Sequence, residues 1–415
     1  MLINFKSLLV VISLGGVFCI LNAANAANVE RIFSPSGIEI WYVQEPSIPV
    51  ISLSIGFSGG SALDPKNKQG LARLAVALLD EGAGDLDDKN FQSAVVDNSI
   101  DLKFRVGRDM IRVSLRTLSK NRTEAFKLLG VSLREPRFDS AALKRVKNQL
   151  ISSINSDQMN PNSIAIRRWF EVVFGEHPYA KPVSGNVKGL SAVDRSDLLT
   201  FVKERITKSK MVIGASGDIP GKEFALLIDK ALSKLPVKGR HETLMFEDVN
   251  PTEHYEVIKM AIPQSVAVFG LKGLRRNDQD FYAAYVMNYI LGGSGFTSRL
   301  YKEIRENRGL AYSVYSYLHP MEHEGLILGG VATRNDAISQ SLGLIRKELN
   351  KMSEFGVSES ELSNAKQGIT GSFPLRFDSG QSIAAMLVSM QFEGLGIDYI
   401  DNRNKYIDQV TVHDI

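Results

Sequence analysis

Apolar and polar residues follow two different periods along this chain. Where they alternate with a period of two we predict half-buried strands, and where apolar residues return every three or four positions we predict helices. The predicted strands of the first half are Ile32–Val43, Val50–Phe57, Leu102–Val106, Ile111–Leu115 and Met211–Ser216. The predicted helices of this half are Gln69–Glu81, Arg122–Glu135, Ser140–Ser156, Arg195–Ile206 and Gly221–Leu235.

The second half repeats this order of elements, although residue identity between the two halves is low. Its predicted strands are Ala261–Leu271, Ala311–Leu318 and Gly325–Thr333. Its predicted helices are Gln279–Leu291, Thr297–Arg308, Ala337–Met352 and Glu359–Gly371. Strands mixed with helices predict an α+β fold of two homologous halves, each a mostly antiparallel sheet with helices packed on one face.

The predicted domains are a first half at residues 27–235, a polar linker at 236–250 and a second half at 251–415. Two large domains are the natural expectation for 415 residues. Residues 1–26 have the pattern of a bacterial secretory signal: a charge at Lys6, a mostly apolar run from Leu8 to Leu21, and Ala24-Asn25-Ala26 as the cleavage site. We therefore expect a periplasmic protein, with an uncleaved membrane anchor as the alternative.

The composition excludes several classes of protein. Hydrophobic residues make up 44% and charged residues 23%, as in ordinary soluble globular proteins. The formal net charge of +3 gives no electrostatic case for binding nucleic acid. The only cysteine, Cys19, lies in the predicted signal, so the mature chain would have no thiol for a disulfide or a metal. No later stretch is long and apolar enough to span a membrane.

The stretch from Leu291 to Leu318 contains the candidate binding residues. A glycine turn precedes the predicted helix 297–308, whose apolar face would comprise Phe296, Leu300 and Ile304, and Gly309 is placed where a left-handed helix end belongs. Arg305 then comes from the end of a helix and Tyr312 from the start of a strand. A guanidinium and a phenol held at such a junction could hydrogen-bond the carbonyls of an extended peptide. The alternative is an ordinary surface arginine and a packing tyrosine.

This stretch reads G-G-x-x-x-x-S-R-L-Y-x-x-x-R-x-x-x-G-L-A-Y from Gly292 to Tyr312 and resembles the C-terminal half of the pitrilysin/insulinase-type zinc peptidases, the inverzincins. The resemblance also covers G-G-S-x-x-D-P-x-x-x-x-G-L-A at residues 59–72 and His177-Pro178-Tyr179. It implies a chain of two similar halves in which Arg305 and Tyr312 bind substrate.

The zinc helix of that family, G-L-A-H-x-x-E-H, is degenerate here. Arg73 stands for the first histidine, Val76 for the catalytic glutamate and Ala77 for the second histidine, and none of them can bind zinc. No glutamate occurs between Glu135 and Glu171 to serve as the distal ligand. We therefore expect no zinc or other cofactor in this chain and no proteolysis by the chain alone.

No other motif replaces the missing site. His319 and His323 have the spacing of a helical metal-binding pair, but Pro320 and the surrounding strand-turn-strand pattern predict a loop. There is no G-x-S-x-G nucleophile motif, and the glycine turn lacks the Gly-Lys-Ser/Thr ending of a phosphate-binding loop.

The resemblance implies a non-catalytic subunit of a periplasmic heterodimeric zinc peptidase. The partner would carry the intact H-x-x-E-H helix and the zinc, while Arg305 and Tyr312 hold peptide or unfolded protein substrates in extended form. The alternative is a scaffold or binding protein of the same fold without a part in proteolysis. A neighbouring gene that encodes the intact zinc helix would favour the peptidase subunit.

The last residues, Val410–Ile415, parallel Val193–Leu198 of the first half, where the chain continues into a helix and a strand. Thr411 is then the expected N-cap of a helix. We expect the native protein to be longer by about one helix and one strand, elements of ordinary length. A chain that stops at Ile415 should leave one sheet edge of the second half unpaired.

Overall fold

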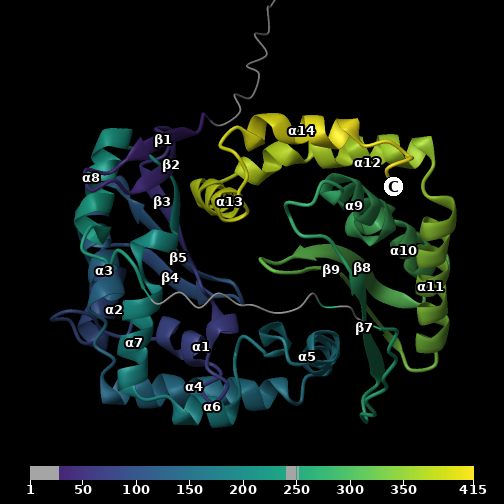
Figure 1. Cartoon of the computed structure of the whole chain (residues 1–415), viewed down its shortest axis with the longest axis horizontal. Coiled ribbons are helices and arrows are strands. Elements are labelled where there is room, and N and C mark those ends of the chain that lie inside the picture. The colour runs from purple at the N-terminus through teal and green to yellow at the C-terminus, as the bar shows by residue number, and fades with distance from the viewer. Residues whose placement is uncertain (1–27, 240–248, 250–251) are drawn as a thin grey trace, which may run out of the picture.

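The computed structural model describes residues 28–239, 249 and 252–415 (Figure 1). The predicted signal peptide and most of the predicted linker lie outside the described residues. No described helix combines the length and apolarity needed to cross a membrane.

The first half is built on a six-stranded sheet with the order β1-β2-β6-β3-β5-β4. Its strands are β1 (Glu30–Phe33), β2 (Glu39–Gln44), β3 (Val50–Ser58), β4 (Asp101–Val106), β5 (Met110–Leu118) and β6 (Met211–Gly217). All neighbours are antiparallel except β2 and β6. The predicted single strand Ile32–Val43 is wrong, because a turn with Gly37 at φ 84° splits it into the hairpin β1–β2.

Helices of the first half cover one face of this sheet, which we call its outer face (Figure 1). They are α1 (Leu71–Val76), α2 (Asp88–Asp97), α3 (Arg122–Arg134), α4 (Ser140–Asp157), α6 (Val187–Ala192), α7 (Arg195–Arg205) and α8 (Gly221–Leu232). Every second residue of β3, including Leu53, Ile55 and Phe57, is buried against them. The first helix is shorter than predicted, because the backbone beyond Val76 tightens into i→i+3 hydrogen bonds.

The second half has a three-stranded antiparallel sheet with the order β7-β9-β8. The strands are β7 (Gln264–Lys272), β8 (Ala311–Pro320) and β9 (Gly325–Arg334). Its outer face packs on α9 (Phe281–Asn288), α10 (Arg299–Tyr301), α11 (Ile338–Phe355), α12 (Glu359–Gly371) and α14 (Tyr399–Gln409). The order β7-β9-β8 repeats the order β3-β5-β4 of the first half, which confirms the predicted α+β fold of two similar halves.

One detail is the same in the two halves, and another differs. Thr411 donates its backbone N–H to the carboxylate of Asp414 at 2.7 Å, as Asp194 does to Asp197 at 3.0 Å. In the first half β6 lies beside β3, whereas no described strand takes that place beside β7. This agrees with the expected unpaired edge; the length of the native chain stays a prediction.

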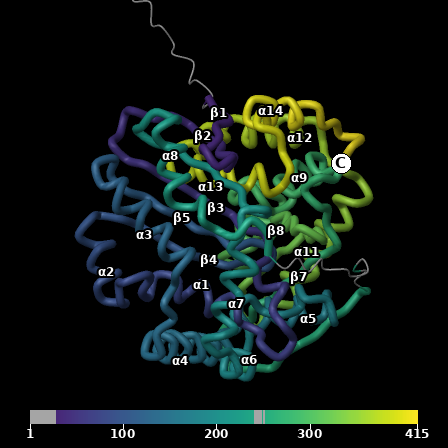
Figure 2. Tube along the Cα trace, turned by 60° about the vertical axis from the view of Figure 1, so that its left-hand side comes forward, coloured from purple at the N-terminus to yellow at the C-terminus, as the bar shows by residue number. Residues whose placement is uncertain are grey.

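One helix of each half packs on the inner face of the other half's sheet, which is the face opposite the outer face (Figures 1 and 2). Helix α5 (Pro161–Phe174) packs its Phe170 against Leu326 and Leu328 of β9. Helix α13 (Gly380–Phe392) lies on β3 and β6. It lies so close that a Cβ on Gly214 would be 2.5 Å from a carbonyl oxygen of α13. Neither helix was predicted, and together they join the two halves.

Candidate functional site

Arg305 and Tyr312 are in direct contact. The guanidinium carbon of Arg305 lies 4.5 Å from the ring centre of Tyr312, within the range of a cation–π interaction. Tyr312 is the extra residue of a β-bulge, because Ala311 pairs with Thr333 and Ser313 with Ala332. The bulge turns the tyrosine outward and leaves it 81% exposed. The predicted simple alternation, with Tyr312 on the face of Val314, is therefore wrong.

A second aromatic ring also contacts Arg305. Tyr301, one helical turn earlier, has its ring centre 4.9 Å from the same guanidinium carbon. Phe296 stands edge-on to Tyr301 at 5.0 Å. Sequence reasoning missed Tyr301, although its spacing of four residues from Arg305 places both on one helix face. We call Phe296, Tyr301, Arg305 and Tyr312 the Arg305 cluster.

The guanidinium of Arg305 has no hydrogen-bond acceptor among the side chains and carbonyls that the structure describes. Its neighbour Arg308, by contrast, is ion-paired with Glu303 and also donates to the Glu303 carbonyl at 2.7 Å. Within the described part of the chain, the Arg305 guanidinium makes cation–π contacts with Tyr301 and Tyr312. Its N–H groups are therefore oriented by stacking and still available to a ligand.

The backbone around the cluster departs from a regular helix. The predicted helix 297–308 comprises α10 and then a π-helical segment at Lys302–Glu306 that contains Arg305. Such segments are frequent at functional sites. Gly309 closes the helix with φ 60°, as predicted. Leu300 and Ile304 are fully buried, as predicted for the apolar face.

Phe296 is not part of that apolar face. It lies in a short 3₁₀ turn before α10 and is 72% exposed. The preceding glycine turn has a packing role, because a Cβ on Gly292 would lie 2.4 Å from the hydroxyl of Ser316 in β8. The turn therefore fixes α10 against β8.

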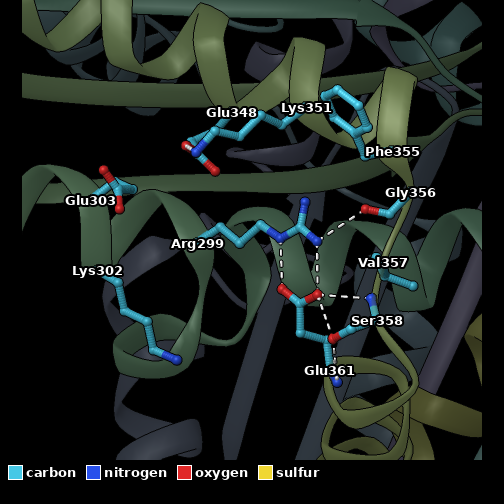
Figure 3. A pocket seen from close by; sticks show the side chains of 10 residues that line it. All are labelled: Arg299, Lys302, Glu303, Glu348, Lys351, Phe355, Gly356, Val357, Ser358 and Glu361. Atoms are coloured by element: carbon cyan, nitrogen blue, oxygen red, sulfur yellow. Dashed lines mark hydrogen bonds and ion pairs between the residues drawn. The ribbon is translucent and has the colours of Figure 1, made fainter.

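Arg299, three residues after the end of the glycine turn, anchors the cluster to α12. Its guanidinium donates two hydrogen bonds to Glu361 at 2.7 and 2.8 Å and a third to the Gly356 carbonyl at 3.0 Å (Figure 3). These bonds lower the pKa of Glu361 to about 2. The pair forms one wall of an open pocket of about 440 Å³. Because Arg299 is fully engaged there, its role is structural.

The degenerate zinc helix keeps its shape without its ligands. In α1, Arg73 and Ala77 are half-buried on one side and Val76 is completely buried. Asp64 receives hydrogen bonds from the backbone N–H groups of Gly70 and Ala72, at 3.0 and 3.1 Å, so it caps α1. Burial raises the pKa of Asp64 to about 6 against the opposing effect of Arg205. The G-G-S-x-x-D-P motif thus positions the helix and needs no metal to do so.

The region between the halves explains the His177-Pro178-Tyr179 motif. The Tyr179 hydroxyl donates to Asp109 at 2.6 Å, and Glu322 N–H donates to the other oxygen of Asp109 at 3.2 Å. The N–H of His323 donates to the Tyr179 hydroxyl at 3.3 Å. These bonds join the tip of the β4–β5 hairpin to the tip of the β8–β9 hairpin. We call Asp109 and Tyr179 the inter-half latch.

The loop predicted for the histidine pair is correct for His323 and wrong for His319, because β8 extends through Pro320. His319 is in the last residues of β8 and His323 is in the turn that follows. Burial, helped by Arg108, lowers the pKa of His319. Across the residues that the structure describes, no three His, Cys, Asp or Glu side chains are grouped so that they could hold a metal ion.

Comparison with known proteins shows which family the chain resembles. The family described as "Peptidase M16 inactive domain" matches residues 192–369. The Helicobacter pylori protein named "Non-peptidase homolog YmxG" is 26% identical over 403 residues, covering 96% of this chain and 92% of its own. A solved "peptidase M16 inactive domain" from Pseudomonas fluorescens has a TM-score of 0.86 at 28% identity and covers 93% of both chains. A solved protease from Helicobacter pylori has the same fold, with a TM-score of 0.81 at 17% identity over 94% of this chain and 95% of its own.

Residues 192–369 therefore match the M16 peptidase family, and nearly the whole chain is similar to proteins of this family, the pitrilysin/insulinase type that its motifs resemble. The matched family is described as an inactive domain and the Helicobacter pylori relative as a non-peptidase homologue, which agrees with Arg73, Val76 and Ala77 at the zinc-helix positions of this chain. The family description and the relative's name also agree with a chain that holds no zinc of its own.

Proposed function

We propose that this chain is the non-catalytic, substrate-binding subunit of a heterodimeric zinc peptidase. It holds an extended peptide against the zinc of a partner that carries an intact H-x-x-E-H helix. The observation that carries the proposal is the guanidinium of Arg305, which makes cation–π contacts with Tyr301 and Tyr312 and is unpaired with any described acceptor. Arg308, three residues later, is by contrast paired with Glu303.

The chemistry divides between the two subunits. The partner supplies zinc and the activated water, because α1 of this chain has no ligand atoms at the corresponding positions. This chain supplies position: Arg305 and the Tyr312 hydroxyl donate hydrogen bonds to backbone carbonyls of the peptide. A substrate held in the reactive geometry has a lower entropic barrier. The substrates are peptides or unfolded proteins, because only an extended chain offers its carbonyls to both residues.

The predicted signal peptide supports a periplasmic location for both subunits. Fractionation of the native host with an antibody against this chain tests the location. Recovery of the unprocessed chain in the cytoplasm would contradict it.

Reconstitution tests the proposal. The chain is mixed with its zinc-helix partner, co-purified from the native host, and cleavage of a quenched fluorescent peptide is measured for each subunit and for the mixture. We expect no cleavage by this chain, weak cleavage by the partner and full cleavage by the complex, with zinc bound to the partner alone. One tightly bound zinc per purified copy of this chain, with chelator-sensitive cleavage, would refute the proposal.

The alternative is a scaffold of the same fold. It predicts a stable complex whose turnover does not depend on the Arg305 cluster. The same reconstituted complex therefore separates the two functions once Arg305 is substituted.

A further inference from the structure

The inner face of the first sheet carries a group of cations on its two last strands. Arg105 of β4 lies directly opposite Arg112 of β5, Lys103 opposite Ser114, and Asp101 opposite Arg116. Residues directly opposite each other in an antiparallel pair lie on the same face of the sheet. Lys103, Arg105, Arg112 and Arg116 therefore share one face, which we call the basic inner face.

This face looks toward the second half of the molecule. Gly56 of β3 pairs with Arg112 and so lies on the same side of the sheet. A Cβ on Gly56 would lie 3.0 Å from Val388 of α13, which comes from the second half. Arg112 itself donates to the Ala385 carbonyl at 3.3 Å and to Ser389 at 3.2 Å. Helix α13 covers β3 and β6 and leaves the inner face of β4 and β5 open.

The arrangement of charges on this face is unfavourable for the protein alone. Two arginines directly opposite each other repel, and such pairs destabilise a sheet. Among the described residues of β4 and β5, the one carboxylate on this face is Asp101, which pairs with Lys103 at 2.8 Å along its own strand and not with its register partner Arg116. Glu393, which follows α13, attracts the guanidinium of Arg112. Within the described part of the chain, neither Arg105 nor Arg116 makes a hydrogen bond or ion pair through its side chain. Their charges are uncompensated and point to an anionic ligand.

The inner face of the second sheet is aromatic where α5 leaves it uncovered. Tyr315 and Tyr317 of β8 are 49% and 41% exposed, and their stacked ring centres lie 6.2 Å apart. The same strand carries Tyr312 of the Arg305 cluster as its second residue. The inner face of the first sheet thus offers a wall of cations, and the inner face of the second sheet offers a wall of tyrosines on the strand that also carries Tyr312.

We propose that the basic inner face binds acidic segments of an extended polypeptide whose other part lies at the Arg305 cluster. The proposal rests on the proposed function and names the substrate class: chains rich in Asp and Glu beside apolar residues. A polypeptide fits both walls, because its carboxylates complement Arg105 and Arg116 and its apolar side chains pack on Tyr315 and Tyr317. Nucleic acid fits less well, since the whole chain carries a net charge of only +3.

Fluorescence anisotropy with the full chain tests this directly. Three labelled peptides share their apolar positions and carry Glu, Gln or Lys at the remaining positions. We expect the Glu peptide to bind about tenfold more tightly than the Gln peptide at low salt and the Lys peptide most weakly, with the preference lost at high salt. Equal binding of the three peptides, or no measurable binding of the Glu peptide, would overturn the proposal.

Substitutions locate the effect. Arg105→Ala and Arg116→Ala should each weaken binding of the Glu peptide about threefold and leave the Gln peptide unchanged. Arg346→Ala is the control, because it removes the same charge from α11 on the outside of the second half (Figure 1). An equal loss with Arg346→Ala would mean that only overall charge matters, and the proposal would be wrong.

A stability measurement excludes a structural role for Arg105. If the residue serves folding, Arg105→Ser lowers the melting temperature. We expect it to rise instead, because the repulsion from Arg112 is removed. The two proposals can fail separately. If the peptides show no charge preference but Arg305→Ala still lowers turnover, only the acidic substrate class is wrong. If the charge preference is found but Arg305→Ala leaves turnover unchanged, only the positioning role is wrong.

Discussion

Arg305 and Tyr312 are stacked at 4.5 Å although one ends a helix and the other interrupts a strand. Only five residues, from Asn307 to Ala311, lie between the end of the π-helical segment and the bulge residue Tyr312. Gly309 makes the connection possible, because its φ of 60° lies in the left-handed region that other residues avoid. The cluster therefore depends on one glycine.

Gly309→Ala should lower the free energy of unfolding by about 1 kcal/mol, because a left-handed alanine is strained. Gly343→Ala is the matched control: Gly343 lies inside α11 with open space around its Cα, so alanine there should stabilise the helix by a similar amount. Urea denaturation of both variants checks the opposite signs. Equal effects would mean that the Gly309 backbone is not restrained.

The hydrogen bonds of the inter-half latch predict that removal of the Tyr179 hydroxyl destabilises the protein. Tyr179→Phe leaves Asp109 without its 2.6 Å hydrogen bond in the contact between the hairpins. We expect a loss of about 1–3 kcal/mol in the free energy of unfolding. Tyr315→Phe is the control, because its hydroxyl is on an exposed side chain and should change stability by less than about 0.5 kcal/mol. Thermal unfolding that is the same for the two variants would argue against the latch.

Val76 occupies the position of the catalytic glutamate in the degenerate zinc helix, and we predict that a glutamate placed there destabilises the protein. Val76 is completely buried, so Val76→Glu places a carboxylate in an apolar core without a partner. We expect a loss of at least about 2–4 kcal/mol, or failure to fold. Arg73→His, at a half-buried position of the same helix, should cost less than about 1 kcal/mol. A Val76→Glu variant as stable as the wild type would show that this position is open to solvent.

Arg299 and Glu361 predict a dependence of stability on acid pH. The pKa of Glu361 falls from 4.5 to about 2 on folding, chiefly through its hydrogen bonds with Arg299. The ionised carboxylate thus stabilises the fold above about pH 4.5, and this contribution is lost as the pH falls toward 2. Glu361→Gln should be less stable than the wild type at neutral pH, and the difference should shrink in acid. A difference that is constant from pH 7 to the acid limit of folding would contradict the assignment.

The sequence predicts those parts of the fold that depend on neighbours along the chain. The hairpin at residues 102–115, the left-handed Gly309 and the buried Leu300 and Ile304 follow from local periods and from the chemistry of glycine. The missing zinc site follows from residue type alone, because Arg73, Val76 and Ala77 offer no ligand atom. Each of these features is determined by residues that are close together along the chain.

The features that shape the candidate site are non-local. Helix α13 is apolar on most sides because it is enclosed between the halves, so it has no amphipathic period to find. The bulge at Tyr312 exists only in the register of β8 against β9. The opposition of Arg105 and Arg112 likewise needs the hairpin register, and its orientation toward the second half needs α13.

The most direct test of the central claim is kcat/KM for peptide cleavage by the complex of this chain with its zinc-bearing partner. Arg305→Ala is compared with Arg308→Ala, which removes the same charge three residues later from an arginine paired with Glu303. Loss of a charged hydrogen bond to the substrate is worth about 1.5–3 kcal/mol, so Arg305→Ala should lower kcat/KM by about tenfold to a hundredfold without dissociating the complex. Arg308→Ala should stay within about twofold of the wild type. Wild-type turnover by the Arg305→Ala complex would contradict the claim that this chain positions the substrate.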